Sequence, residues 1–231
     1  MVMSQIQYTV QPVQWQAGLR MLAVPLWRAG YDGRMPSAPP PSAQRPSAPH
    51  PSARDRVLDA FEQILITQGE RAATLEATAT EAGVSKGGLL YHFGSKDALV
   101  EGLLLRLVGL VDIDVERIRT AETGPIDYFL RSSLNLQSDL DRAIIATTRL
   151  AQGSHPQARD ALKAMQVAWY DVIVEVVGDR ALARTIMLIG DGLYYNSALL
   201  PGGLGEIDPR SDDMNEVIAL VTTLVEARAR A

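Results

Sequence analysis

The sequence of 231 residues contains no cysteine. This absence excludes disulfide frameworks, thiolate catalysis and zinc sites built on cysteine. Histidine is also scarce, and His50, His92 and His155 lie too far apart in sequence to show a metal-ligand spacing. We therefore expect no metal and no other cofactor.

Long apolar runs are missing as well. A membrane-spanning helix needs about 20 consecutive apolar residues, and no run in this sequence approaches that length. The best N-terminal candidate for a signal peptide, AGLRMLAVPLW, is interrupted by Arg20 and Pro25. These absences predict a soluble cytoplasmic protein with no membrane partner.

A strongly basic segment is the third absence. The net charge is −5, and residues 54–100 carry five basic against seven acidic side chains. Any contact with nucleic acid must therefore come from local placement of cations and not from a basic stretch. Aromatic residues make up only 6% of the chain, but apolar residues reach 47%, so leucine, valine, isoleucine and alanine can fill a core.

Residues 1–51 differ in texture from everything that follows. The tripeptide PSA begins four times at a period of five from residue 36, and seven prolines lie between residues 36 and 51. So many prolines exclude a helix, and we expect a disordered or extended N-terminal extension. It could be a passive tail or a ligand for a proline-reading domain. Another hypothesis is that translation starts at Met35 or later.

From residue 52 the pattern is helical. Ser52, Thr74, Ser85, Ser95 and Ser138 stand where helix N-caps are expected, and Gly69 and Gly83 where helices end. No alternating strand pattern of useful length appears, so the predicted fold is all-α. The expected helices span approximately residues 52–68, 75–82, 86–92, 96–119, 125–136, 139–151, 156–177, 179–200 and 212–230.

The stretch AGVSKGGLLYHFGSKDAL, residues 82–99, has the helix, turn and helix spacing of a helix-turn-helix unit. Gly87 and Gly88 cost helix stability but remove side chains that would keep the backbone away from a duplex. Lys86, Tyr91 and nearby basic groups can donate to phosphates. A phosphate-binding enzyme loop is the alternative, but its spacing and its preceding strand are both absent.

The longer segment TLEATATEAGVSKGGLLYHFGSKDAL resembles the DNA-binding signature of the TetR family of bacterial transcriptional regulators. The resemblance implies a three-helix DNA-binding domain at residues 52–100, called the head below. It also implies a helical ligand-binding and dimerisation domain at residues 101–231, called the body. By position, Val84, Leu89 and Phe93 would form the core of the head. The implied DNA-binding residues are Thr74, Ser85, Lys86, Gly87, Gly88, Tyr91, His92 and Lys96.

Three positions depart from the family pattern. The family commonly has tyrosine where Leu90 stands, so its phosphate contact would pass to Tyr91. A bulky aliphatic residue is usual where Thr78 stands, which predicts a looser core beneath the second helix. Gly88 replaces a frequent hydroxyl residue and removes one possible contact to DNA.

The body contains two segments with broad apolar faces, ALARTIMLIGDGLYYNSALL and MNEVIALVTTLVEARA. The resemblance implies that these last two long helices form a four-helix dimer interface, while internal core is the alternative. Asp191 could pair with a cationic ligand, or with Arg149 or Arg184, and the flanking glycines could serve close packing across the dimer. Candidate ligand-binding residues, which combine aromatic surface with polar groups, are Tyr128, Arg149, Met165, Trp169, Asp191 and Tyr194.

These features together predict a homodimeric repressor that a small-molecule effector releases from a palindromic double-stranded operator. Activation remains an alternative to repression. A second alternative is a helical enzyme or ligand-sequestering protein with a non-functional DNA-binding head. The sequence shows no acid–base pair, metal spacing or nucleophile motif, so we expect that it is not an enzyme.

Overall fold

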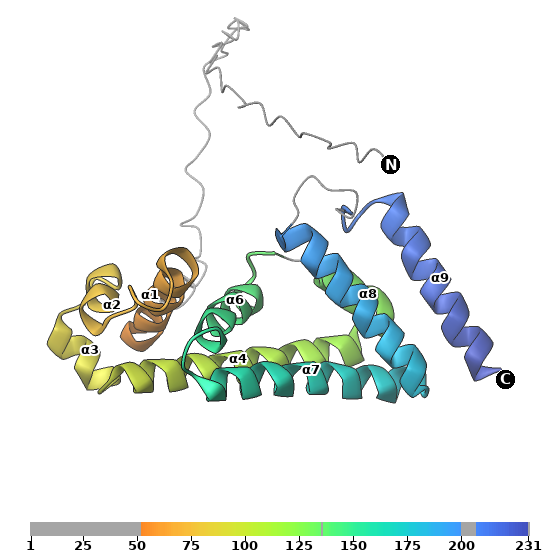
Figure 1. Ribbon diagram of the computed structural model, residues 1–231. Coiled ribbons are helices and arrows are strands. Elements are labelled where there is room, and N and C mark those ends of the chain that lie inside the picture. The colour runs from red at the N-terminus through yellow and green to blue at the C-terminus, as the bar shows by residue number, and fades with distance from the viewer. Residues whose placement is uncertain (1–51, 135, 200–206, 231) are drawn as a thin grey trace, which may run out of the picture. The chain divides into compact units, whose positions relative to one another are not determined.

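A computed structural model describes residues 52–134, 136–199 and 207–230. The chain divides into two units, residues 1–47 and 48–231, and every described residue belongs to the second. The expectations for the extension at residues 1–51 therefore lie outside the described residues. The described part is entirely helical, as predicted (Figure 1). Its helices are α1 (Ala53–Gln68), α2 (Leu75–Glu81), α3 (Lys86–His92), α4 (Lys96–Thr120), α5 (Pro125–Ser132), α6 (Asp139–Ala151), α7 (Pro156–Val177), α8 (Arg180–Leu199) and α9 (Asp212–Ala229).

The five predicted N-caps are confirmed. In each case the side-chain oxygen accepts a hydrogen bond from the backbone N–H three residues later, at 3.0–3.1 Å. Such bonds satisfy N–H groups that have no partner within the helix. Local sequence therefore fixes where α1, α2, α3, α4 and α6 begin.

Helix α5 is shorter than its apolar pattern predicts. It ends at Ser132 and does not reach Leu136. The hydroxyls of Ser132 and Ser133 both donate to the carbonyl of Phe129, at 3.0 and 2.9 Å. Serine side chains that bond to nearby backbone compete with helix propagation, which accounts for the early end.

The core of the head is formed by α1, α3 and the first turns of α4, which Figure 1 shows together. Leu89 and Phe93 are buried, as expected, and Val84 is half-buried against the same cluster. Gly102 lets α4 approach Phe93, since a Cβ there would lie 2.8 Å from its ring. Thr78 is fully buried, and its hydroxyl has no hydrogen-bond partner among the described residues.

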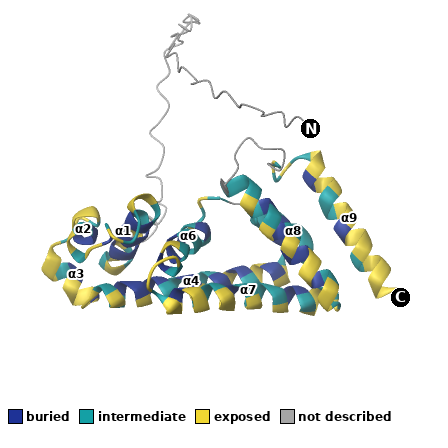
Figure 2. Cartoon of the chain, in the orientation of Figure 1, coloured by how far each residue is buried: buried dark blue, intermediate teal, exposed yellow. Residues whose placement is uncertain are grey.

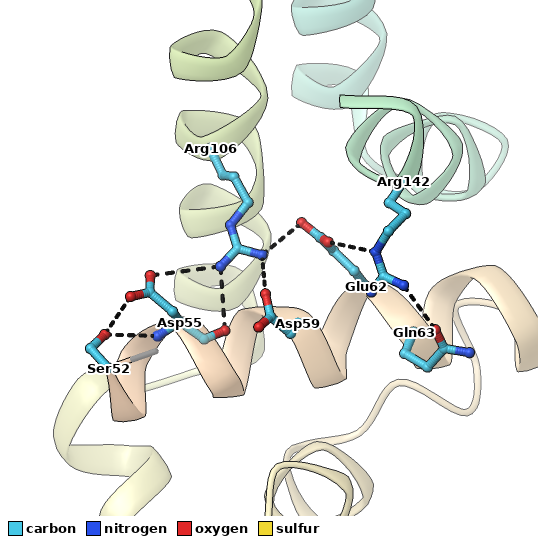
Figure 3. A network of polar contacts seen from close by, with 7 residues as sticks. All are labelled: Ser52, Asp55, Asp59, Glu62, Gln63, Arg106 and Arg142. Carbon is cyan, nitrogen blue, oxygen red and sulfur yellow. Dashed lines mark hydrogen bonds and ion pairs between the residues drawn. The ribbon is translucent and has the colours of Figure 1, made fainter. Parts of the chain in front are cut away.

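A charged network joins α1 to α4 and α6 (Figure 3). The guanidinium of Arg106 on α4 donates to Asp59 at 2.7 Å and to Glu62 at 3.1 Å, and lies 3.7 Å from Asp55. Arg142 on α6 lies 3.9 Å from the second carboxylate oxygen of Glu62. Only 2% of Glu62 is exposed, so this carboxylate depends on its two arginines.

The rest of the body packs around a second apolar cluster to which α5, α7, α8 and α9 contribute. Helix α9 buries only Met214 and Val221, and Figure 2 colours much of its surface as exposed. Exposed leucines stand on both α8 and α9: Leu188 is 64% exposed and Leu220 63%. Among the described helices, none is long and apolar enough to cross a membrane.

Candidate nucleic-acid interface and ligand cavity

The turn between α2 and α3 sets the angle of the helix-turn-helix unit. Gly83 has φ of +64°, a left-handed conformation that glycine adopts without steric cost. The N–H of Gly83 bonds to the carbonyl of Thr80, and that of Val84 to Ala79 at 3.0 Å, which together close the end of α2. The sequence Ala-Gly-Val between the two helices therefore fixes how α3 leaves α2.

The surface of α3 carries the predicted recognition residues. Tyr91 is 86% exposed, and its ring lies edge-on to that of His92, with the centroids 5.1 Å apart. Ser85 and Gly87 are exposed and Gly88 is half-buried. A Cβ added at Gly87 would meet no atom within 4 Å, so packing within the protein does not require glycine there.

Lys86 is held by an ion pair that sequence reasoning did not anticipate. Its ammonium group donates to the carboxylate of Glu76, at the start of α2. The hydrogen bond from Lys86 lowers the pKa of Glu76, so this carboxyl stays charged at neutral pH. The ion pair places a negative charge beside the exposed face of α3.

Thr74 and Lys96 lie just before and just after the helix-turn-helix unit formed by α2 and α3. Thr74 is exposed and caps α2. The ammonium group of Lys96 donates to the backbone carbonyl of Glu70 at 3.0 Å. The carboxylate of Glu70 also lies 2.9 Å from a ring nitrogen of His155, at the start of α7. Lys96 therefore ties α4 to the segment between α1 and α2.

A cavity of about 720 Å³ lies among α4, α5, α6, α7 and α8. Five of the six predicted ligand residues line it, namely Tyr128, Met165, Trp169, Asp191 and Tyr194. Arg149 does not line the cavity. It lies on the exposed side of α6, whereas Asp141 and Ile144 of the same helix face the cavity.

Asp114 is one of two buried aspartates that line the cavity, and the sequence-based prediction missed both. One carboxylate oxygen accepts from the Tyr128 hydroxyl at 2.8 Å, and the other from the Trp169 indole N–H at 3.0 Å. Burial raises the pKa of Asp114, although both hydrogen bonds oppose that shift. Burial and the Asp114 contact raise the pKa of Tyr128 to about 12, so the tyrosine is a neutral donor.

Asp141 forms a similar pair on α6. It accepts from the Tyr194 hydroxyl at 2.8 Å and from the backbone N–H of Gln137 at 2.7 Å. Burial and the Asp141 contact raise the pKa of Tyr194, so this hydroxyl is also a neutral donor. Gly190 allows α8 to pack closely against α5, because a Cβ there would lie 2.8 Å from the ring of Phe129. Close packing at Gly190 is therefore accounted for within the chain, whereas a Cβ added at Gly192 would meet no atom within 4 Å.

The cavity has no counterpart of a catalytic metal centre. No group of three or more histidine, aspartate or glutamate side chains that could hold a metal occurs in the described parts of the chain. The polar groups of the wall are hydroxyl, indole, amide and guanidinium donors beside carboxylates. This set can hold and orient a ligand.

Residues 57–103, which contain the helix-turn-helix unit, match the model of the bacterial regulatory proteins of the tetR family. The head of the chain therefore matches the TetR family. This head spans α1, α2, α3 and the start of α4, and the resemblance seen in the sequence is confirmed.

Relatives of the chain include the HTH-type transcriptional regulator UidR of Escherichia coli K12. The two are 25% identical over 134 residues, which cover 54% of this chain and 65% of UidR. The alignment therefore spans somewhat less than two thirds of the relative.

Two solved structures resemble the described fold. GusR of Salmonella enterica has a TM-score of 0.56 at 19% identity, covering 75% of this chain and 95% of that one. NalD, the secondary repressor of the MexAB-OprM multidrug efflux pump in Pseudomonas aeruginosa, has a TM-score of 0.51 at 18% identity. That match covers 74% of this chain and 95% of NalD. At these identities the likeness concerns the fold.

Proposed function

We propose that this protein is a homodimeric transcriptional repressor that binds a palindromic DNA operator and is released by a small-molecule effector. The observation that carries the proposal is the exposed face of α3, with Tyr91 86% exposed beside His92 and Gly87. A tyrosine exposed to this extent buries almost no apolar surface in its own fold. Such a side chain is available for contact with another molecule. Because α3 is the second helix of a helix-turn-helix unit, we infer that this molecule is DNA.

The body supports the remaining parts of the proposal. Exposed leucines on α8 and α9 offer an apolar surface for a second copy, and two heads on one body double the phosphate contacts. The cavity, at about 720 Å³, falls within the range of small-molecule sites. An effector shifts the population away from DNA only if it binds better to the conformation that does not fit the operator.

Replacement of Tyr91 by alanine is expected to weaken operator binding at least about tenfold, because a hydrogen bond to a charged phosphate is lost in each protomer. The fold should keep its stability, since the side chain is 86% exposed. Binding is measured by fluorescence anisotropy with labelled operator. Tyr91→Phe keeps the ring and removes the hydroxyl, so comparison with Tyr91→Ala shows which of the two contributes to affinity. Unchanged operator affinity in Tyr91→Ala would contradict the proposal that α3 contacts DNA.

Replacement of Glu76 by glutamine is expected to have the opposite effect. It releases Lys86 from its ion pair and removes a negative charge beside α3. Operator affinity should rise several-fold, and the slope of log affinity against log salt should steepen by about one for each protomer. Glu81→Gln is the matched control on α2, because Glu81 is exposed and has no ion-pair partner among the described residues. Equal effects of the two substitutions would contradict a specific role for the Lys86 pair.

The function as a whole is tested by selecting genomic fragments that the purified protein retains. A regulator should enrich a palindromic sequence, and its affinity should fall steeply as salt increases. Reporter expression with and without the protein then separates repression from activation. Failure to select any double-stranded sequence in low salt would instead favour a ligand-sequestering protein with an inactive head.

A further inference from the structure

The cavity wall carries more negative than positive charge. Four of its lining residues are aspartates, and Arg117 is the one lining residue with a cationic side chain among those described. None of the four aspartates forms an ion pair within 4.0 Å of another described residue, although the positive charge of Arg117 acts to lower the pKa of Asp114. The four are Asp114, Asp139, Asp141 and Asp191.

The two buried aspartates are held in place by neutral donors. Asp114 is 7% exposed and Asp141 6%, and the side chains that donate to them are the hydroxyls of Tyr128 and Tyr194 and the indole of Trp169. These bonds orient the carboxylates without cancelling their charge. Burial of a carboxylate that no cation contacts directly costs free energy, which the more distant charge of Arg117 offsets only in part at Asp114, and a bound cation would recover more of that cost.

Aromatic side chains complete the wall around Asp114. The rings of Trp169 and Phe129 are arranged edge to face, with their centroids 6.4 Å apart, and both line the cavity together with Tyr128. Aromatic faces attract cations through their quadrupole, most strongly where water is excluded. Carboxylates and aromatic faces therefore favour the same class of ligand.

We propose that the cavity between α4 and α8 is a binding site for a lipophilic organic cation, with Asp114 as its main counter-charge. The ligand carries its positive charge on a substituted ammonium or a comparable centre and fills the apolar space beside Trp169 and Met165. The role of such a cation as an effector rests on the proposed repressor function. The binding chemistry does not, because it follows from the cavity wall alone.

The test uses the full-length protein and two probes of nearly equal size and opposite charge, tetraphenylphosphonium and tetraphenylborate. Each is titrated by isothermal calorimetry. The phosphonium is expected to bind at least about tenfold more tightly than the borate. Equal affinity, or tighter binding of the borate, overturns the proposal and would assign the site to an anion held by Arg117. This comparison needs no variant and is independent of how any substitution affects folding.

Asp114→Asn keeps the shape of the side chain and removes its charge. It is expected to weaken phosphonium binding about tenfold and to leave borate binding equal or stronger. Asp112→Asn is the matched control, because Asp112 lies on the same helix, is exposed and does not line the cavity. Asp191→Asn, at an exposed lining position, should weaken phosphonium binding in the same direction. Unchanged phosphonium affinity in both lining variants overturns the proposal.

Operator binding in the presence of the phosphonium separates this inference from the proposed function. If the phosphonium binds and the protein never binds DNA, the cation site stands and the repressor function fails. If DNA is bound and the borate is preferred, the repressor function stands and the cation site fails.

Discussion

Replacement of Arg106 by methionine is expected to lower the free energy of unfolding by about 3 kcal/mol, since it leaves a buried carboxylate without its main partner. The Arg106 side chain is 19% exposed and contacts three acidic residues of α1, of which Glu62 is almost fully buried. In the variant, Glu62 would keep only Arg142, at 3.9 Å. Urea denaturation followed by circular dichroism measures the loss.

The pH dependence of this loss tests its cause. Burial raises the pKa of Glu62 above its ordinary value, and the Arg106 contacts oppose that shift, so the substitution should raise the pKa further. A carboxyl with a raised folded pKa stabilises the fold at low pH, and that stabilisation is lost as pH rises through the folded pKa. The deficit of Arg106→Met should therefore be larger at pH 8 than at pH 5.

Two further variants make the Arg106 result specific. Arg119→Met lies on the same helix, but Arg119 is 42% exposed and its acidic partners are exposed too, so the loss should stay below about 1 kcal/mol. Adding Glu62→Gln to Arg106→Met removes the unpaired charge and should recover much of the stability. A deficit that is independent of pH and not recovered by glutamine would show that lost packing, and not charge, is responsible.

The features that sequence predicts well here are local. An N-cap needs only a hydroxyl and a backbone N–H three residues later, so Ser85 and Ser95 can be read from the chain and are confirmed. Helix α5 shows the limit of this approach. Its apolar pattern continues past Ser132, but the serine hydroxyls bond to the carbonyl of Phe129 and the helix ends there.

The features that sequence missed depend on packing between elements. Lys86 lies ten residues after Glu76, and only the turn at Gly83 brings their side chains together. Asp114 is different, because the sequence did contain a pattern that indicates its burial. It falls in the same helical phase as the buried residues Leu107, Val111 and Ile118, and a carboxylate in such a phase must have polar partners. Those partners, on α5 and α7, could not be named before the helices were packed.

Replacement of both Leu188 and Leu220 by glutamate is expected to convert the protein into a monomer and to weaken operator binding about a hundredfold or more. The proposed interface places Leu188 of α8 and Leu220 of α9, which are 64% and 63% exposed, against a second copy. Glutamates there would bury like charges without partners. A free head then loses the effective concentration that the second head provides.

Sedimentation equilibrium gives the mass of this double variant, and anisotropy gives its affinity for a full operator and for a half-site. Half-site affinity should change little, because the substitutions are on α8 and α9 and do not touch α3. Val167→Glu is the control, since Val167 is also an apolar residue that is more than half exposed, at 55%, and it lies on α7. A double variant that remains dimeric would place the interface elsewhere. A monomer with full operator affinity would show instead that one head suffices for DNA binding, against the argument from doubled phosphate contacts.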